Sequence, residues 1–193
     1  MGAKNHHYLP QAYLAGFTRA GTAESVFWVF DTRTGECRRQ TPKNTAAERY
    51  FYAADTETGD RSLHIEEGLA KIEGLVLPVV RKVDAGEPIS LEEKQLLGLF
   101  VGLLFTRVPQ FKRAHAEATD GMAKAMHEIA FGTVEQVQAR LRQWEAEHGE
   151  KSPVTAEEFH QYIESGKYDV APQKNSYLRT MLEAGMEFGW RLW

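Results

Sequence analysis

The chain has 193 residues, of which 42% are hydrophobic and 26% charged, and its formal net charge is −4. This composition is typical of a globular protein and argues against a general nucleic-acid coat, which needs an excess of basic residues. A single cysteine, Cys37, excludes an intrachain disulfide and a thiolate metal site, and it fits a reducing cytoplasm. No apolar run approaches the roughly 18 residues of a transmembrane helix, and the start has no signal-peptide apolar region. We therefore expect a soluble cytoplasmic protein.

The chain opens with a dense polar and aromatic run, Asn5-His6-His7-Tyr8-Leu9-Pro10-Gln11. A neutral imidazole can act as a general base near pH 7 or bind a metal ion. Alternatively, one histidine stabilises the N-terminal turn by hydrogen bonding, and its role is then structural.

Residues 1–60 are β-like and turn-rich. The β-branched and aromatic residues 26–31 predict a strand, Gly35 ends a turn, and residues 36–40 return, which gives a hairpin over about 25–41. Residues 42–45 close the hairpin. Asn44 or Thr45 is expected to cap a short helical turn that continues through Glu48.

Residues 61–193 predict helices. Apolar residues at helical spacing indicate a helix over about 62–84, which Pro78 should kink or split. A capping box at Ser90 and Glu93 opens the next helix, which is apolar nearly all round and is expected to be central and buried. Pro109 marks its end or a bend, and another helix runs over about 110–130.

Two more capping boxes, at Thr133 and Thr155, open a charged helix to about 148 and a short one to about 165. The last helix begins near residue 175 and has an apolar stripe that ends in Trp190 and Trp193. Gly185 and Gly189 lie one turn apart and would let another backbone approach closely. The stripe is buried in the core, binds a second subunit, or packs against further chain.

Together these elements predict an α+β fold, mostly α. The histidine motif and hairpin form residues 1–60, and five or six helices form residues 61–193, within one compact unit.

The opening resembles the bacterial domain of unknown function number 4238, whose members begin His-His-Tyr-x-Pro-x-x-Tyr-Leu-x-x-Phe. The matching residues here are His6, His7, Tyr8, Pro10, Gln11, Tyr13, Leu14 and Phe17. The resemblance continues over roughly residues 5–113, through Trp28, Asp31, Pro42, Asn44, Phe51, Tyr52, Ile65, Glu66, Leu69, Ile72, Glu73, Arg107 and Pro109. The resemblance implies that family members continue into a β-rich part, which we expect this chain to lack. It implies positions for a site but no mechanism.

The opening also resembles the His-His-x-x-Pro-Gln start of some HNH nucleases, where histidine activates water beside a divalent metal. Asn44 lies at a plausible distance for a second element, but no later histidine supplies the third.

Acidic residues on the first long helix are candidate partners for the histidines. Glu66 and Glu73 lie two turns apart on one face, about 10 Å at 1.5 Å per residue. They could form a cluster with His7, His64 and Glu67, with His7, Glu66 and Glu73 as metal ligands. The alternative is a solvated face, or an ion pair with Arg107.

Arg107 follows a very apolar helix, and a buried arginine needs a carboxylate or phosphate partner. It pairs either with Glu66 or Glu73, or with an anionic ligand. Arg107, Lys112 and Arg113, with Phe111 between them, could also contact a nucleic-acid backbone, although three charges are few.

Two functions follow. In the first, the chain is a hydrolase acting on a phosphate-containing substrate, such as a nuclease-like toxin or defence protein, and it could use a divalent metal as cofactor. Its catalytic residues would be His6, His7, Glu66 and Arg107, and its ligand-binding residues Tyr8, Gln11, Asn44 and Glu73. In the second, the chain is a non-catalytic module that binds a protein partner or a second copy through Trp190 and Trp193.

Overall fold

The computed structural model describes residues 5–52, 54–55, 61–62 and 64–191. These residues divide into two units, one of residues 1–112 and 174–193, the other of residues 113–173. The first unit joins the N-terminal motif to three helices and the last helix. This division differs from the sequence-based one at residue 60.

The first unit begins with small antiparallel elements. Strand β1 (Asn5–His7) pairs with β4 (Ala47–Arg49), β2 (Phe27–Phe30) with β3 (Cys37–Gln40), and β5 (Ala54–Asp55) with β6 (Arg61–Ser62). Helix α1 (Gln11–Ala15) and the 3₁₀ turn η1 (Pro42–Asn44) lie between them. The β2–β3 hairpin confirms the prediction, with Gly35 at φ 74° in its turn.

The expected helical turn through Glu48 is wrong. The 3₁₀ turn ends at Asn44, Ala46 has a φ of 55°, and residues 47–49 form β4 instead. A positive φ interrupts a right-handed helix, and pairing with β1 satisfies the backbone groups that a helix would have used. This pairing sets His6 opposite Glu48.

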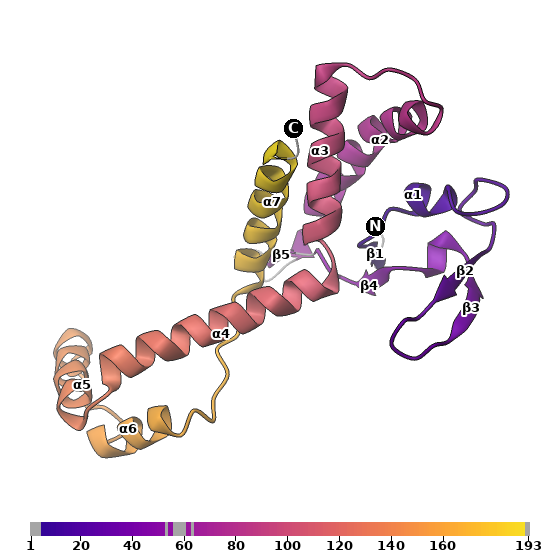
Figure 1. Ribbon diagram of the computed structural model, residues 1–193. Helices are drawn as coiled ribbons and strands as arrows, with labels where there is room; N and C mark the ends of the chain where they lie inside the picture. Colours follow the sequence, from indigo (N-terminus) through magenta and orange to yellow (C-terminus); the bar gives the residue numbers. More distant parts are fainter. Residues whose placement is uncertain (1–4, 53, 56–60, 63, 192–193) are drawn as a thin grey trace. The chain divides into compact units, whose positions relative to one another are not determined.

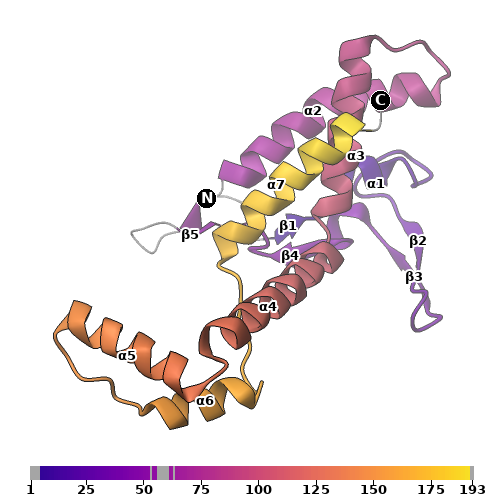
Figure 2. The same ribbon diagram turned by 60° about the vertical axis from the view of Figure 1, so that its left-hand side comes forward.

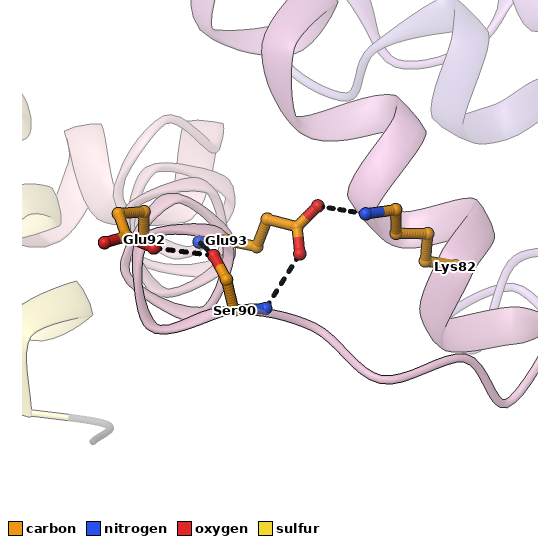
Figure 3. A network of polar contacts seen from close by, with 4 residues as sticks. All are labelled: Lys82, Ser90, Glu92 and Glu93. Atoms are coloured by element: carbon orange, nitrogen blue, oxygen red, sulfur yellow. Dashed lines mark hydrogen bonds and ion pairs between the residues drawn. The ribbon is translucent and has the colours of Figure 1, made fainter.

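The long helices of the first unit lie close to the ranges predicted from the sequence. They are α2 (His64–Asp84), α3 (Leu91–Thr106), the start of α4 (Pro109–Phe131) and α7 (Lys174–Arg191). Pro78 lies inside α2 without splitting it. The capping box at Ser90 opens α3, and Glu93 accepts from both the Ser90 amide and the Lys82 ammonium, as Figure 3 shows. This contact joins the N-terminal end of α3 to α2.

The α3 helix is less buried than its composition predicts. Val101 and Phe105 are exposed, and Phe105 stacks on Phe188 of α7. Elsewhere α3 packs against α7, beside which it lies in Figures 1 and 2, and against α2. Because α2 and α7 cover only part of its surface, the all-round apolar character of α3 does not mean all-round burial.

Glycines let α3 and α7 approach closely. A Cβ added to Gly102 would lie 1.9 Å from the carbonyl oxygen of Gly185, and one added to Gly189 would lie 2.6 Å from that of Gly98. The close approach predicted for Gly185 and Gly189 is therefore confirmed, with α3 as the partner. The adjoining core contains Phe51, Tyr52, Leu69, Leu103, Tyr177, Leu178 and Met181.

The second unit contains most of α4, then α5 (Val134–His148) and α6 (Ala156–Glu164). Both predicted capping boxes, at Thr133 and Thr155, are present, and Gly149 ends α5 with a φ of 70°. The fold is thus α+β and mostly α, as predicted. Within the residues that the structure describes, no helix is long and apolar enough to cross a membrane.

Candidate functional site

His6 is held on both sides of its ring. It lies in β1 and is 0% exposed. Its Nδ1 accepts a hydrogen bond of 2.9 Å from the main-chain N–H of Tyr52, so the ring proton is on Nε2. Nε2 lies 2.9 Å from Oε2 of Glu66. With its lone pair occupied by a buried amide, His6 is poorly placed to act as a base.

His7 points to a different part of the motif. Its Nε2 lies 3.0 Å from the carbonyl oxygen of Lys43, which can only accept, so Nε2 donates. Its Nδ1 then accepts from the side-chain amide of Gln11 at 3.3 Å. His7 therefore ties β1 to η1 and α1.

Glu66 contacts the buried His6 ring and is also partly exposed to solvent. It comes from the first turn of α2, and its side chain is 28% exposed. Burial raises the pKa of its carboxyl above the usual value, and the negative charges of Glu73 and Glu67 raise it further. A carboxyl with a raised pKa is suited to proton transfer.

Arg107 is the C-cap of α3 and is 1% exposed. Its Nη1 lies 2.7 Å from Oε1 of Glu73, and its Nε donates to the carbonyl oxygen of Tyr8 at 2.9 Å. Nη2 is buried with no hydrogen-bond partner among the described residues. The guanidinium thus joins α3 to α2 and to the N-terminal motif, and one of its nitrogens remains available.

Tyr52 belongs to this cluster, although its chemistry was not predicted. Its amide binds His6, its ring stacks on His6, and its hydroxyl donates to the carbonyl oxygen of Arg107 at 3.2 Å. Burial raises the pKa of the Tyr52 hydroxyl, so it remains a donor. The Phe51-Tyr52 pair was the available signal, since a buried tyrosine needs a partner for its hydroxyl.

The remaining predicted residues lie around this cluster or apart from it. Tyr8 contributes its carbonyl oxygen and packs its ring on Phe51. Asn44 is exposed at the end of η1. His64 and Glu67 form a separate exposed pair, with 3.6 Å between Nδ1 and Oε2.

The predicted metal set does not assemble. Among the described residues no group of three or more histidine, cysteine, aspartate or glutamate side chains could hold a metal ion. His7 binds Lys43 and Gln11, whereas Glu66 faces His6 and Glu73 binds Arg107. The carboxylates that were expected to meet His7 therefore have other partners.

The basic residues Arg107, Lys112 and Arg113, which were considered as a nucleic-acid contact, have different surroundings. Lys112 lies over the Phe51 ring, and its ammonium is 3.9 Å from Glu48, while Phe111 packs against the core. Arg113 belongs to the second unit. Of the two terminal tryptophans, Trp190 is 71% exposed, and Trp193 lies outside the described residues.

The cluster can therefore move a proton at Glu66 and hold an anion at Arg107. It contains a hydrogen bond from the neutral His6 ring to Glu66 and an ion pair of Arg107 with Glu73, and both carboxylates come from one face of α2. The contact with the buried His6 holds the Glu66 carboxylate in position.

Comparison with known proteins gives a family and no activity. The family described as "Protein of unknown function (DUF4238)" matches residues 5–191, which extends the resemblance beyond residue 113 to the end of α7. No curated protein and no solved structure matches the chain. With nearly the whole chain matched, the protein belongs to the DUF4238 family of proteins of unknown function.

Proposed function

We propose that the protein is a hydrolase acting on a phosphate-containing substrate, in which Glu66 rather than a histidine transfers the proton. One observation carries the proposal: the partly exposed Glu66 carboxyl lies against the fully buried His6, 2.9 Å from its Nε2. The raised pKa of Glu66 supports it. His6 is then a positioning residue, which replaces its expected role as the base.

In the proposed step, the Glu66 carboxylate takes a proton from water while the water oxygen bonds to phosphorus. The bond from phosphorus to the leaving oxygen breaks, and the protonated carboxyl returns its proton to that oxygen. Because the base must be ionised, the rate rises with pH through the raised pKa of Glu66.

The phosphate part of the proposal rests on Arg107. A guanidinium nitrogen without an acceptor favours an anionic oxygen, and Nη2 of Arg107 is such a nitrogen among the described residues. Since the side chain is 1% exposed, a substrate reaches it only when neighbouring residues move, and Tyr8 is a direct contact of Arg107 through its main-chain carbonyl oxygen. Substrate binding should therefore alter the environment of Tyr8.

The experiment compares the wild type with Glu66→Gln and with Glu67→Gln, a matched exposed neighbour on the same helix. Each is incubated with phosphomonoesters, phosphodiesters and short RNA and DNA, with Mg²⁺, with Mn²⁺ or with EDTA. We expect hydrolysis by the wild type and Glu67→Gln, and a loss on the order of 10²-fold or more in Glu66→Gln. Full activity of Glu66→Gln, or no hydrolysis by the wild type under any condition, contradicts the proposal.

A second candidate is a non-catalytic module that binds a protein partner through α7. Exposed Trp190 favours it, because this side chain borders a pocket of about 560 Å³ between α3 and α7, lined by Leu91, Gln95, Leu96, Leu99, Met186, Gly189 and Trp190. Such a pocket suits the apolar side of a partner helix. Under this candidate Trp190→Ala abolishes partner binding, and Glu66→Gln has no effect on it.

A further inference from the structure

The second unit contains a pocket of its own, of about 360 Å³, which is within the range of small-molecule sites. Its lining is mostly apolar and comes from the end of α4, one face of α5, the loop after α5, and α6. The apolar side chains are those of Phe131, Val137, Leu141, Trp144, Val154 and Phe159. The pocket shares no residue with the proposed hydrolase site or with the Trp190 pocket.

Helix α5 supplies the floor and one side of this pocket. Val137, Leu141 and Trp144 are spaced by four and three residues, so they lie on one face of the helix. Val137 is 0% exposed, whereas Trp144 is 36% exposed. The pocket therefore has a closed apolar end at Val137 and opens to solvent beside Trp144.

The loop between α5 and α6 is held across this face by polar contacts with Glu145. The Glu145 carboxylate accepts from the main-chain N–H of Ser152 at 2.9 Å and from the ammonium of Lys151 at 3.0 Å. These contacts fix the start of the segment that carries Val154, and the capping box at Thr155 fixes its end. The loop thus forms a defined wall of the pocket.

The aromatic walls are also held by contacts of their own. Phe131 and Phe159 pack edge to face, with 5.2 Å between ring centroids, and Nδ1 of His160 donates to the carbonyl oxygen of Phe131 at 3.0 Å. The Trp144 ring stacks on His148 at 4.6 Å. Because these rings already have fixed neighbours, a ligand can bind with little reorganisation of the pocket.

Two polar side chains line the pocket, and only one of them is engaged by the protein. The Ser152 hydroxyl donates to the carbonyl oxygen of Val154 at 2.8 Å and accepts from the Val154 amide at 3.3 Å. Arg140 lies on α5 one turn before Trp144, and in the part of the chain that the structure describes no carboxylate lies within ion-pair distance of it.

The charge of Arg140 decides which ligand suits the aromatic pocket. Aromatic rings alone would also suit a cationic ligand, but a guanidinium in the lining repels one. A guanidinium instead binds a carboxylate through two parallel hydrogen bonds, and aromatic walls favour a ring that can pack against them edge to face or offset.

We propose that this pocket binds a small aromatic carboxylate. Its ring lies among Phe131, Trp144 and Phe159, and its carboxylate pairs with Arg140. The proposal concerns binding alone and does not depend on hydrolysis at Glu66.

The test compares acids with their neutral amides on the full chain. Phenylacetate and 3-phenylpropionate, and the two corresponding amides, are titrated by calorimetry and by NMR. We expect each acid to bind on the order of tenfold more tightly than its amide. Added salt should weaken the acids and leave the amides unchanged. The indole N–H signal of Trp144, assigned with Trp144→Phe, should shift on binding.

Substitutions then locate the site. Arg140→Gln should reduce the affinity for each acid to that for its amide. Arg142→Gln is the matched control, because Arg142 lies on the same helix but does not line this pocket. Val154→Trp should fill the pocket and abolish binding of acid and amide alike, and since Val154 is 40% exposed the fold should tolerate it. Circular dichroism checks that each variant remains folded.

Any of three results would overturn the proposal. The first is that neither acid binds the wild type at millimolar concentrations. The second is equal affinity of the wild type for acid and amide. The third is binding that both Arg140→Gln and Val154→Trp leave unchanged, and a shift of the Trp190 indole signal would then place the ligand in the pocket beside α7. None of these results bears on phosphoester hydrolysis, so the two proposals fail independently.

Discussion

Two joints hold the first unit together by opposite means. The polar joint, made of His6, Glu66, Glu73 and Arg107, ties the N-terminal motif to α2 and α3 through buried charges and hydrogen bonds. The glycine joint, made of Gly98, Gly102, Gly185 and Gly189, brings α3 and α7 together by lacking side chains. The polar joint should therefore fail when atoms are removed, and the glycine joint when atoms are added.

The largest effect is expected for Arg107→Ala. Removing the guanidinium leaves the Glu73 carboxylate and the Tyr8 carbonyl without their buried partner, which should cost about 3–5 kcal/mol of the free energy of unfolding. Urea denaturation measures this cost. Arg179→Ala is the control, because Arg179 pairs with Glu183 at the surface and its loss should leave stability near the wild-type value.

A double-mutant cycle measures the interaction between Arg107 and Glu73 separately from their other contacts. If Arg107 and Glu73 stabilise the fold through each other, the double alanine variant should lose clearly less than the sum of the two single losses. Strictly additive losses would show that Arg107 acts through its other contacts alone.

His6→Ala should come next, at about 2–4 kcal/mol, because it leaves the buried Tyr52 amide unpaired and opens a cavity. The neighbouring His7→Ala serves as the comparison. It should cost less, since its two contacts lie nearer the surface. Equal losses in thermal or urea unfolding would contradict the different roles assigned to the two histidines.

At the glycine joint, Gly102→Ala should cost about 1–3 kcal/mol, since its Cβ would collide with the backbone of Gly185 and force the helices apart. Gly74→Ala in α2 makes the same chemical change where nothing lies within 4 Å. It should stabilise the protein by about 0.5–1 kcal/mol. If both substitutions changed the free energy of unfolding in the same direction, the claim that α3 and α7 pack closely at Gly102 would be contradicted.

The smallest effect is the pH dependence contributed by Glu66. Because its pKa is raised on folding, the native state binds the proton more tightly, and stability falls as pH rises from about 4.5 through the raised pKa. Above that window the contribution is constant. Glu66→Gln should remove this part of the profile, measured as urea unfolding between pH 4 and 8. An unchanged profile would assign the slope to other groups.

The sequence predicts those parts of the fold that depend on local signals. Each capping box opens a helix at the expected residue, and the spacing of Gly185 and Gly189 anticipates a close helix contact. The β1–β4 pair was missed because strands of three residues show no usable alternation of apolar and polar residues. In addition, Ala46 has a positive φ, and alanine is not a residue type from which a positive φ is expected.

Which residues form the polar joint was easier to predict from the sequence than which of them contact each other. His6, Glu66, Glu73 and Arg107 were all chosen from the sequence, and Arg107 with Glu73 was one of the pairings considered. The link to His6 rather than His7 depends on β1 register, which turns alternate side chains to opposite faces. The role of Tyr52 depends on its main-chain amide, which carries no sequence signal.

The most direct test of the proposed site is an NMR titration of the Glu66 carboxyl carbon in the folded protein. The structure predicts a pKa above the usual value of 4.5, raised by burial and by Glu73, and therefore lower in Glu73→Gln than in the wild type. Glu67 serves as an internal reference for an exposed carboxyl on the same helix. If Glu66 titrates at or below the ordinary value, and Glu73→Gln does not change it, Glu66 is not the proton-transferring group.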